Sequence, residues 1–216
     1  QSGDFDVGKS VSWWVEGLWN TNLLVFAMQM MLMLVLGHTL ARTSTVKKII
    51  DWAVSKCNNT AEAALLVSLF SLIVGLFNWG LGLIFGAIFA RKVAESFSRT
   101  GRPINYGLIG AAGYSALMIW HGGISGSALI KVAESGYLVE MMKSSLQEVD
   151  ISRIPDQVAL ASTVFSYGNI VVSLFILILV PSTLYLVGKK AKSSVLILKE
   201  IEEPRVVSDS LIGAEK

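Results

Sequence analysis

The sequence predicts an all-α polytopic membrane protein in which transmembrane helices are combined with one re-entrant helical hairpin and one broken helix. Its 216 residues are 53% hydrophobic and only 16% charged, and the mean hydropathy is +0.59. Such a composition excludes a typical soluble domain. The apolar run 61–90 is too long for one membrane crossing, and glycines interrupt both this run and a second one near residue 122. These interruptions predict the hairpin and the broken helix.

The first predicted elements precede the long apolar run. Residues 1–21 contain three tryptophans, which favour the membrane interface, so we expect an extracytoplasmic or interfacial segment. Residues 22–41 are apolar and long enough for a first full span. Residues 46–56 combine apolar and charged side chains at helical spacing. This pattern predicts a helix on the membrane surface, with Trp52 as its anchor.

The run 61–90 predicts the re-entrant hairpin. It holds about thirty residues, which as one helix would reach about 45 Å, whereas the hydrocarbon core is about 30 Å thick. Two full spans would need about forty residues. The segment Asn78-Trp79-Gly80-Leu81-Gly82 is a poor helix former inside the run. We therefore expect two arms that turn near the middle of the membrane and leave on the side of entry, with the second arm starting near Leu83.

The loops on either side of this hairpin are both basic. Residues 42–60 carry four Lys or Arg residues, and residues 91–103 carry four more. The positive-inside rule places such loops on the cytoplasmic side of the membrane. The segment between them must then begin and end on that side, because a single crossing would leave one basic loop outside.

The second glycine-rich interruption predicts a broken span over residues 105–133. An apolar helix is expected to end at Trp120, and the break follows at residues 121–127, where three glycines and two serines gather. A longer, kinked span that closes at Gly136 is the alternative.

The rest of the chain predicts one more span and a tail. An acidic connection leads to a last span over residues 158–188, so the membrane domain covers 22–188. Residues 189–216 are expected to form a cytoplasmic tail or a loop to a missing second half. Because the chain begins with Gln1 and not with Met, we expect it to be a fragment of a longer protein.

The two interruptions form the candidate site. A turn inside the membrane frees backbone groups that a continuous helix would use. The positive end of the following helix favours an anion, and exposed oxygens suit a cation such as Na⁺. We expect Na⁺ at Asn78, Ser125 and Ser127. The candidate substrate- and ion-binding residues are Asn78, Trp79, Gly80, Gly82, His121, Gly122, Gly123, Ser125, Gly126 and Ser127.

Each interruption also has a simpler interpretation. Glycines are common where transmembrane helices pack closely, so residues 78–82 fit a packing surface as well as a binding site. Residues 121–127 fit an ordinary loop at the end of a span. The length of the run 61–90 and the charge of the loops beside it favour the site.

Short strings along most of the chain resemble one bacterial transporter family. They include Glu16-Gly17-Leu18-Trp19-Asn20, Phe26-Ala27-Met28-Gln29-Met30, Gly37-His38-Thr39-Leu40-Ala41, Asn78-Trp79-Gly80-Leu81-Gly82 and Gly122-Gly123-Ile124-Ser125-Gly126-Ser127. The set is similar to the short-chain fatty acid transporters, and more distantly to the ion-transporter superfamily. The resemblance implies an inner-membrane carrier about twice this length, whose second half is an inverted repeat. His121 departs from the glycine expected at that position.

The predicted function is secondary active uptake of short-chain fatty acids or other small monocarboxylates across the bacterial cytoplasmic membrane. A helix N-terminus would hold the carboxylate, and Phe77, Trp79 and Trp120 would pack against the tail. Na⁺ is the expected coupling ion, because the apolar runs 63–90 and 103–130 contain no Asp or Glu to carry a proton. Proton coupling, through a histidine or with the substrate, stays open.

Other classes of function have less support in the residues. The sequence contains no nucleophile–base pair, phosphate-binding loop or metal-ligand spacing, so we expect no enzyme and no cofactor besides Na⁺. The expected partners are the carboxylate, the lipid bilayer and the missing C-terminal half, without nucleic acid, and a homo-oligomer stays open. A carrier of the same fold for dicarboxylates and a truncated, non-transporting membrane subunit are the alternatives.

Overall fold

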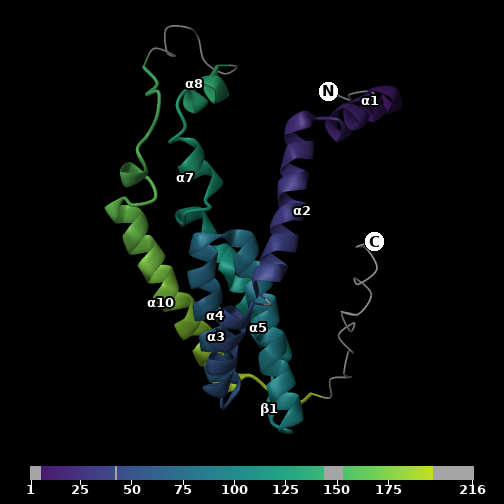
Figure 1. Ribbon diagram of the computed structural model, residues 1–216, viewed down its shortest axis with the longest axis vertical. Helices are drawn as coiled ribbons and strands as arrows, with labels where there is room; N and C mark the ends of the chain where they lie inside the picture. Colours follow the sequence, from purple (N-terminus) through teal and green to yellow (C-terminus); the bar gives the residue numbers. More distant parts are fainter. Residues whose placement is uncertain (1–5, 42, 144–152, 197–216) are drawn as a thin grey trace, which may run out of the picture.

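The computed structural model describes residues 6–41, 43–143 and 153–196 and is mostly helical (Figure 1). Its helices are α1 (Val7–Leu18), α2 (Thr21–Ala41), α3 (Ser44–Ser55), α4 (Thr60–Phe77), α5 (Trp79–Arg99), α6 (Tyr106–Tyr114), α7 (Ser127–Lys131), α8 (Tyr137–Met142) and α10 (Tyr167–Lys190). Short 3-10 turns are η1 (Ser115–Met118), η2 (Trp120–Gly122) and η3 (Leu160–Ser162), and β1 (Pro103–Ile104) pairs antiparallel with β2 (Ser194–Val195). Among the described residues, three helices are long and apolar enough to cross a membrane, over Leu23–Leu40, Thr60–Phe77 and Tyr167–Lys190.

A reciprocal cap starts α4. The Oδ1 atom of Asn59 accepts a hydrogen bond from the backbone N–H of Glu62 at 3.0 Å, and the Glu62 carboxylate accepts one from the backbone N–H of Asn58 at 3.0 Å. Such a cap gives partners to groups that a helix start leaves unpaired. α4 ends at Phe77, and Asn78 is the cap between it and α5. The two helices pack antiparallel, so the beginning of α4 and the end of α5 lie at the same end of the molecule (Figure 1).

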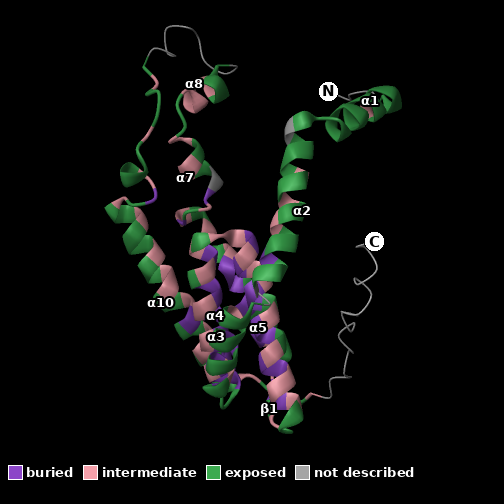
Figure 2. Cartoon of the chain, in the orientation of Figure 1, coloured by how far each residue is buried: buried purple, intermediate pink, exposed green. Residues whose placement is uncertain are grey.

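Small residues bring α4, α5 and α6 into direct backbone contact. A Cβ atom added to Gly82 would lie 2.9 Å from the Cα of Gly75, and one added to Gly86 would collide with the carbonyl of Gly113. Three helices can approach this closely only where side chains are absent. The buried residues in Figure 2 gather at this contact, whereas α2 and most of α10 are exposed.

α2 and α10 lie on the outside of this core. α2 touches α5 near its C-terminal end, where an added Cβ on Gly37 would lie 2.7 Å from the Cδ1 of Ile84. α10 packs along α4 and buries Pro181 and Gly188, and Gly188 rests on the backbone of Ala61. Their other faces are large, apolar and exposed, which suits helices that contact lipid or further protein within a membrane.

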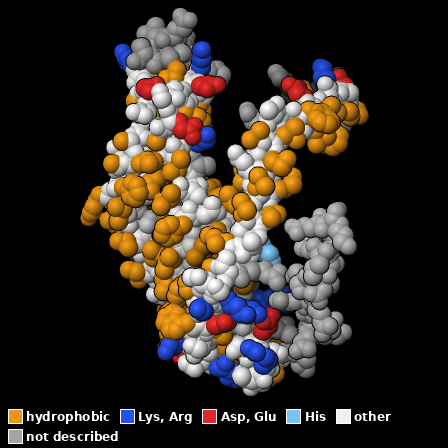
Figure 3. Space-filling model, viewed as in Figure 1, with side chains coloured by type: hydrophobic (Ala, Val, Ile, Leu, Met, Phe, Trp, Pro, Cys, Tyr) orange, Lys and Arg blue, Asp and Glu red, His pale blue; other side chains and the backbone are white. Residues whose placement is uncertain are grey.

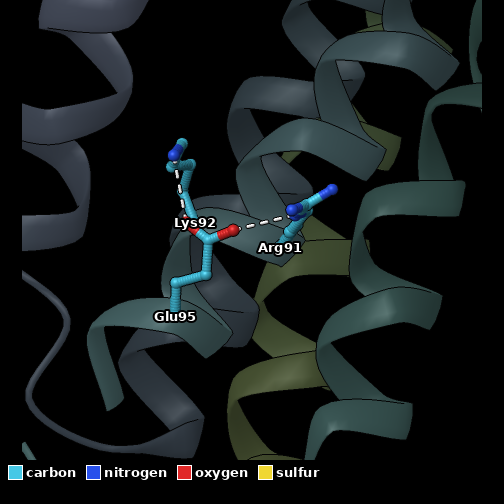
Figure 4. Close-up of polar contacts among 3 residues, drawn as sticks. All are labelled: Arg91, Lys92 and Glu95. Carbon is cyan, nitrogen blue, oxygen red and sulfur yellow. Dashed lines mark hydrogen bonds and ion pairs between the residues drawn. The ribbon is translucent and has the colours of Figure 1, made fainter. Parts of the chain in front are cut away.

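Charged side chains gather near the upper and lower ends of the molecule, and apolar side chains occupy the band between them (Figure 3). Near the lower end, the Glu95 carboxylate binds Arg91 at 2.8 Å and Lys92 at 3.0 Å (Figure 4). Burial alone would raise the pKa of Glu95, but the hydrogen bonds and charges of Arg91 and Lys92 outweigh it and lower this pKa below its ordinary value. Glu95 is therefore an ionised member of the basic end.

Two helix ends differ from the sequence prediction. α5 begins at Trp79 and not near Leu83, because the preceding asparagine caps it directly. The α-helix of the predicted broken span ends at Tyr114 and not at Trp120, and the chain continues as 3-10 turns. The departure from α-helix therefore starts six residues earlier than the glycines indicate, within residues 115–120, where glycine is absent.

Other boundaries differ less. The helix predicted at 46–56 is α3, which buries Ile50 and Ala53 in the main apolar cluster. α10 starts at Tyr167, so the predicted last span loses its first residues to a 3-10 turn and a loop. The predicted terminal segments extend beyond the described residues at 1–5 and 197–216, and the acidic connection does so at 144–152.

The helix contact through Gly86 makes a testable prediction. In the purified chain, Gly86→Ala should lower the midpoint of thermal unfolding, because the new methyl group meets the carbonyl of Gly113 and overpacking costs about 1–3 kcal/mol. Gly110→Ala on α6 is the matched control, because an added Cβ there meets nothing within 4 Å and alanine favours a helix by about 1 kcal/mol. Equal unfolding midpoints for Gly86→Ala and wild type, measured by circular dichroism, would contradict this packing.

Candidate functional site

The turn between α4 and α5 is built on Asn78. Its backbone is extended (φ −156°, ψ 122°), and its N–H donates to the carbonyl of Val74 at 3.0 Å, which completes the end of α4. Its side-chain Oδ1 accepts a hydrogen bond from the N–H of Leu81 at 2.9 Å, and its carbonyl accepts one from the N–H of Gly82 at 2.9 Å. One residue thus ends one helix and caps the next.

The second interruption lies directly against this turn. The Oγ atom of Ser125 accepts a hydrogen bond from the N–H of Trp79 at 3.0 Å, and the N–H of Ile124 donates to the carbonyl of Leu76 at 2.8 Å. Gly123 touches the same Leu76 carbonyl so closely that a side chain would collide with it. The predicted site already includes both interruptions, and in the structure they touch through the Ser125 side chain and through main-chain groups.

The broken segment, residues 119–126, is held by its own backbone. The N–H of Gly126 donates to the carbonyl of Gly123 at 3.1 Å, and a side chain on Gly126 would collide with the carbonyl of His121. The N–H of Gly123 donates to the carbonyl of Trp120 at 3.0 Å. These contacts explain why glycine occupies these positions of the segment: the neighbouring atoms leave no room for a Cβ.

Asn169, which is not among the candidate site residues, connects the broken segment to α10 by hydrogen bonds. The amide nitrogen of Asn169 donates to the carbonyl of Gly122 at 2.8 Å and to the carbonyl of Val164 at 2.7 Å. Ser166 caps the start of α10 by accepting a hydrogen bond from the N–H of Asn169 at 3.3 Å. The signal in the sequence is one amide in an otherwise apolar stretch, which typically indicates a hydrogen bond to a neighbouring helix or loop.

The candidate aromatic residues divide into two groups. Trp79 and Trp120 lie 5.9 Å apart between ring centroids, and His121 stacks on Trp120 at 3.8 Å. Phe77 belongs to the other group and lines a pocket of about 290 Å³ between the end of α4, the broken segment and the start of α10. Neither tryptophan lines this pocket.

The pocket contains two of the candidate residues, Gly122 and Gly123. Its other walls are mainly apolar and come largely from α10, which the candidate set does not include. Asn169 and Ser173 are the polar side chains that line it.

The remaining candidate glycines pack helices together. Gly80 lies against Met33 of α2, and Gly82 lies against Gly75 of α4. Ser127 begins α7, and its hydroxyl is outside the described side chains. No group of three or more His, Cys, Asp or Glu residues that could hold a metal ion occurs in the part of the chain that the structure describes. A Na⁺ site made of hydroxyl, amide and carbonyl oxygens stays a prediction.

Comparison with known proteins identifies the family. Residues 4–212 match the family described as short chain fatty acid transporter. A candidate short-chain fatty acid transporter of Escherichia coli is 33% identical over 171 residues, which cover 79% of this chain and 35% of the relative. The corresponding protein of Haemophilus influenzae is 35% identical over 182 residues, which cover 83% of this chain and 38% of the relative.

The chain thus spans little more than a third of the length of these two curated relatives. No solved structure matches it. The family match covers nearly all of the sequence, includes both helix interruptions and agrees with the apolar helices of the fold. The protein is therefore a membrane protein that belongs to the short-chain fatty acid transporter family.

Proposed function

We propose that this chain forms part of an ion-coupled carrier for the uptake of short-chain monocarboxylates across the bacterial cytoplasmic membrane. The observation that carries the proposal is the contact between the two helix interruptions, through Trp79 with Ser125 and Leu76 with Ile124. Carriers build substrate and ion sites from interrupted helices near the middle of the membrane. Irregular backbone of this kind is stable there only if protein or a watery cavity covers it.

A re-entrant hairpin is supported by the charges of its second arm. The uncharged part of α5, residues 79–90, reaches only about 18 Å at about 1.5 Å per residue, whereas the hydrocarbon core is about 30 Å thick. This arm cannot cross the core without burying Arg91 and Lys92. In Figure 1 the α4–α5 turn lies between the charged ends that Figure 3 displays. The same arrangement leaves both basic loops on one side, as the positive-inside rule requires.

Protein beyond this chain completes the carrier in this proposal. The curated relatives are nearly three times as long as the region they share with it. An inverted repeat in the additional length would supply a second pair of interruptions and enclose the first. The exposed apolar faces of α2 and α10 are available for such packing.

Na⁺ is the proposed coupling ion. The Oδ1 of Asn78 and the Oγ of Ser125 each accept one backbone N–H, and each oxygen keeps a further lone pair for a cation. The carboxylate between residues 63 and 131 is Glu95, which is ionised and paired at the basic end. It is therefore a poor proton carrier for the interruptions.

The topology of the hairpin can be tested by cysteine labelling. In the full-length transporter, Ser55→Cys and Thr100→Cys should both react with a membrane-impermeant maleimide only from the cytoplasmic side, because both basic loops belong there. Burial raises the pKa of the native Cys57 thiol to about 12, so Cys57 stays protonated at neutral pH and should contribute little background. Labelling of Thr100→Cys from the outside, with Ser55→Cys labelled from the inside, would exclude the hairpin.

The contact between the interruptions predicts the effect of one hydroxyl. Ser125→Ala should weaken butyrate uptake about five- to a hundred-fold, because an unpaired N–H at Trp79 costs about 1–3 kcal/mol at this turn. Ser125→Thr keeps an acceptor oxygen and should retain most of the uptake. The amount of membrane-inserted protein is measured alongside. Wild-type uptake by Ser125→Ala would show that the contact is dispensable.

The coupling ion can be tested by substitution. Uptake of butyrate by the full-length transporter should fall strongly when Na⁺ is replaced by choline at fixed pH, because choline is too large for a site made of oxygen ligands at a helix interruption. Uptake that persists without Na⁺ and follows the external pH would favour a proton instead. His121→Gly would then show whether the histidine carries that proton.

A further inference from the structure

The pocket beside the broken segment has the size and lining of a site for a short aliphatic chain. Its volume is about 290 Å³, just below the range of about 300–1,000 Å³ that is typical of sites for drug-sized ligands. One side is formed by Leu76, Phe77 and Ile124, and the other by residues of α10 that include Ile170 and Leu174. A pocket of this size is matched to a small ligand with an apolar body.

The polar groups of the pocket limit what it can hold. A Cβ added to Gly122 would lie 2.7 Å from the Oδ1 of Asn169 and 3.0 Å from the Oγ of Ser173, so both oxygens face the broken segment. The Asn169 amide nitrogen already donates to the carbonyls of Gly122 and Val164, and so offers no hydrogen to a carboxylate. The Ser173 hydroxyl has no protein partner within the described residues. A pocket with so few donors suits the apolar end of a carboxylic acid better than its charged end.

We propose that this pocket binds the aliphatic tail of the transported carboxylate, and that Leu174 limits the length of the chain it accepts. The inference rests on the proposed function and adds the location of the tail. Residues of α10 take the place of Trp79 and Trp120 as the walls of the tail site, because neither tryptophan lines the pocket. The carboxylate then points out of the pocket, toward the protein that completes the carrier.

The geometry favours this occupant over a lipid chain. One wall of the pocket is the irregular backbone of residues 122–124, at the end of the 3-10 turn η2, which is anchored to α4 and α10. Polar backbone is not stable against lipid within the hydrocarbon core. A short acid that brings water or its own carboxylate to the mouth of the pocket avoids this conflict.

The test changes the volume of the pocket and measures chain-length preference. In the full-length transporter, inhibition of labelled butyrate uptake by acids of two to eight carbons gives the preference of each variant. Leu174→Trp fills the pocket and should reduce the preference for butyrate over acetate about tenfold or more, since one methylene in an apolar pocket changes binding about 10- to 200-fold. Leu174→Ala should shift the optimum to longer acids.

Leu179→Trp is the matched control. Both leucines are on α10 with similar exposure, 53% for Leu174 and 48% for Leu179, but Leu179 does not line the pocket. Leu179→Trp should therefore keep the wild-type preference. An unchanged preference in both Leu174 variants would overturn the inference. A second outcome would also overturn it: Leu174→Trp loses uptake of all acids equally, and Leu174→Ala keeps the wild-type preference. In that case a packing contact with protein or lipid would fill the pocket.

A second measurement separates this inference from the proposed function. A cysteine is introduced as Leu174→Cys, and its modification by a small thiol reagent is timed with and without butyrate. Butyrate should slow the reaction at position 174 at least several-fold and leave Leu179→Cys unaffected. Protection without uptake by the wild type would contradict the transport proposal and support the pocket. Uptake without protection would support transport and overturn the pocket.

Discussion

The fold depends on how the chain satisfies the backbone groups that are freed where α4 meets α5. A helix that stops among apolar side chains leaves N–H and C=O groups without partners, and each costs free energy comparable to a lost hydrogen bond. Here Asn78 ends α4 and caps α5, and Ser125 and Ile124 supply further partners from another part of the chain. These bonds pair several of the groups that the turn frees without help from water or lipid headgroups.

The glycines follow from the same constraint. For Ser125 to reach Trp79, the broken segment must lie directly on the end of α4, and this is possible only because Gly123 has no side chain. The contact between Gly86 and Gly113 brings α5 and α6 together in the same way. Close approach of backbones and capping of a turn are therefore two parts of one arrangement. The two interpretations of the glycines in the sequence, packing and site formation, do not exclude each other.

The sequence predicts some of these features better than others. The position of the α4–α5 turn is clear from the sequence, because Asn78 and the two glycines after it are poor helix formers in an apolar run. The early end of α6 at Tyr114 could not be predicted, since residues 115–120 are apolar and compatible with a helix, and tertiary contacts override that tendency. The hydrogen-bond partners of Trp79 and Gly122 could not be predicted either, because spacing along a helix gives no information on residues more than forty positions away.

The long-range bonds at the interruptions have a consequence for biosynthesis. Trp79 receives its partner from a residue 46 positions later, and Gly122 receives Asn169 from 47 positions later. At about 5–20 residues per second, each wait lasts roughly 2–9 s. The Trp79 N–H has no access to its partner until residue 125 has been made, and the broken segment has no access to its anchor until residue 169 has been made. The order of synthesis therefore sets the earliest moment at which each part of this arrangement can close.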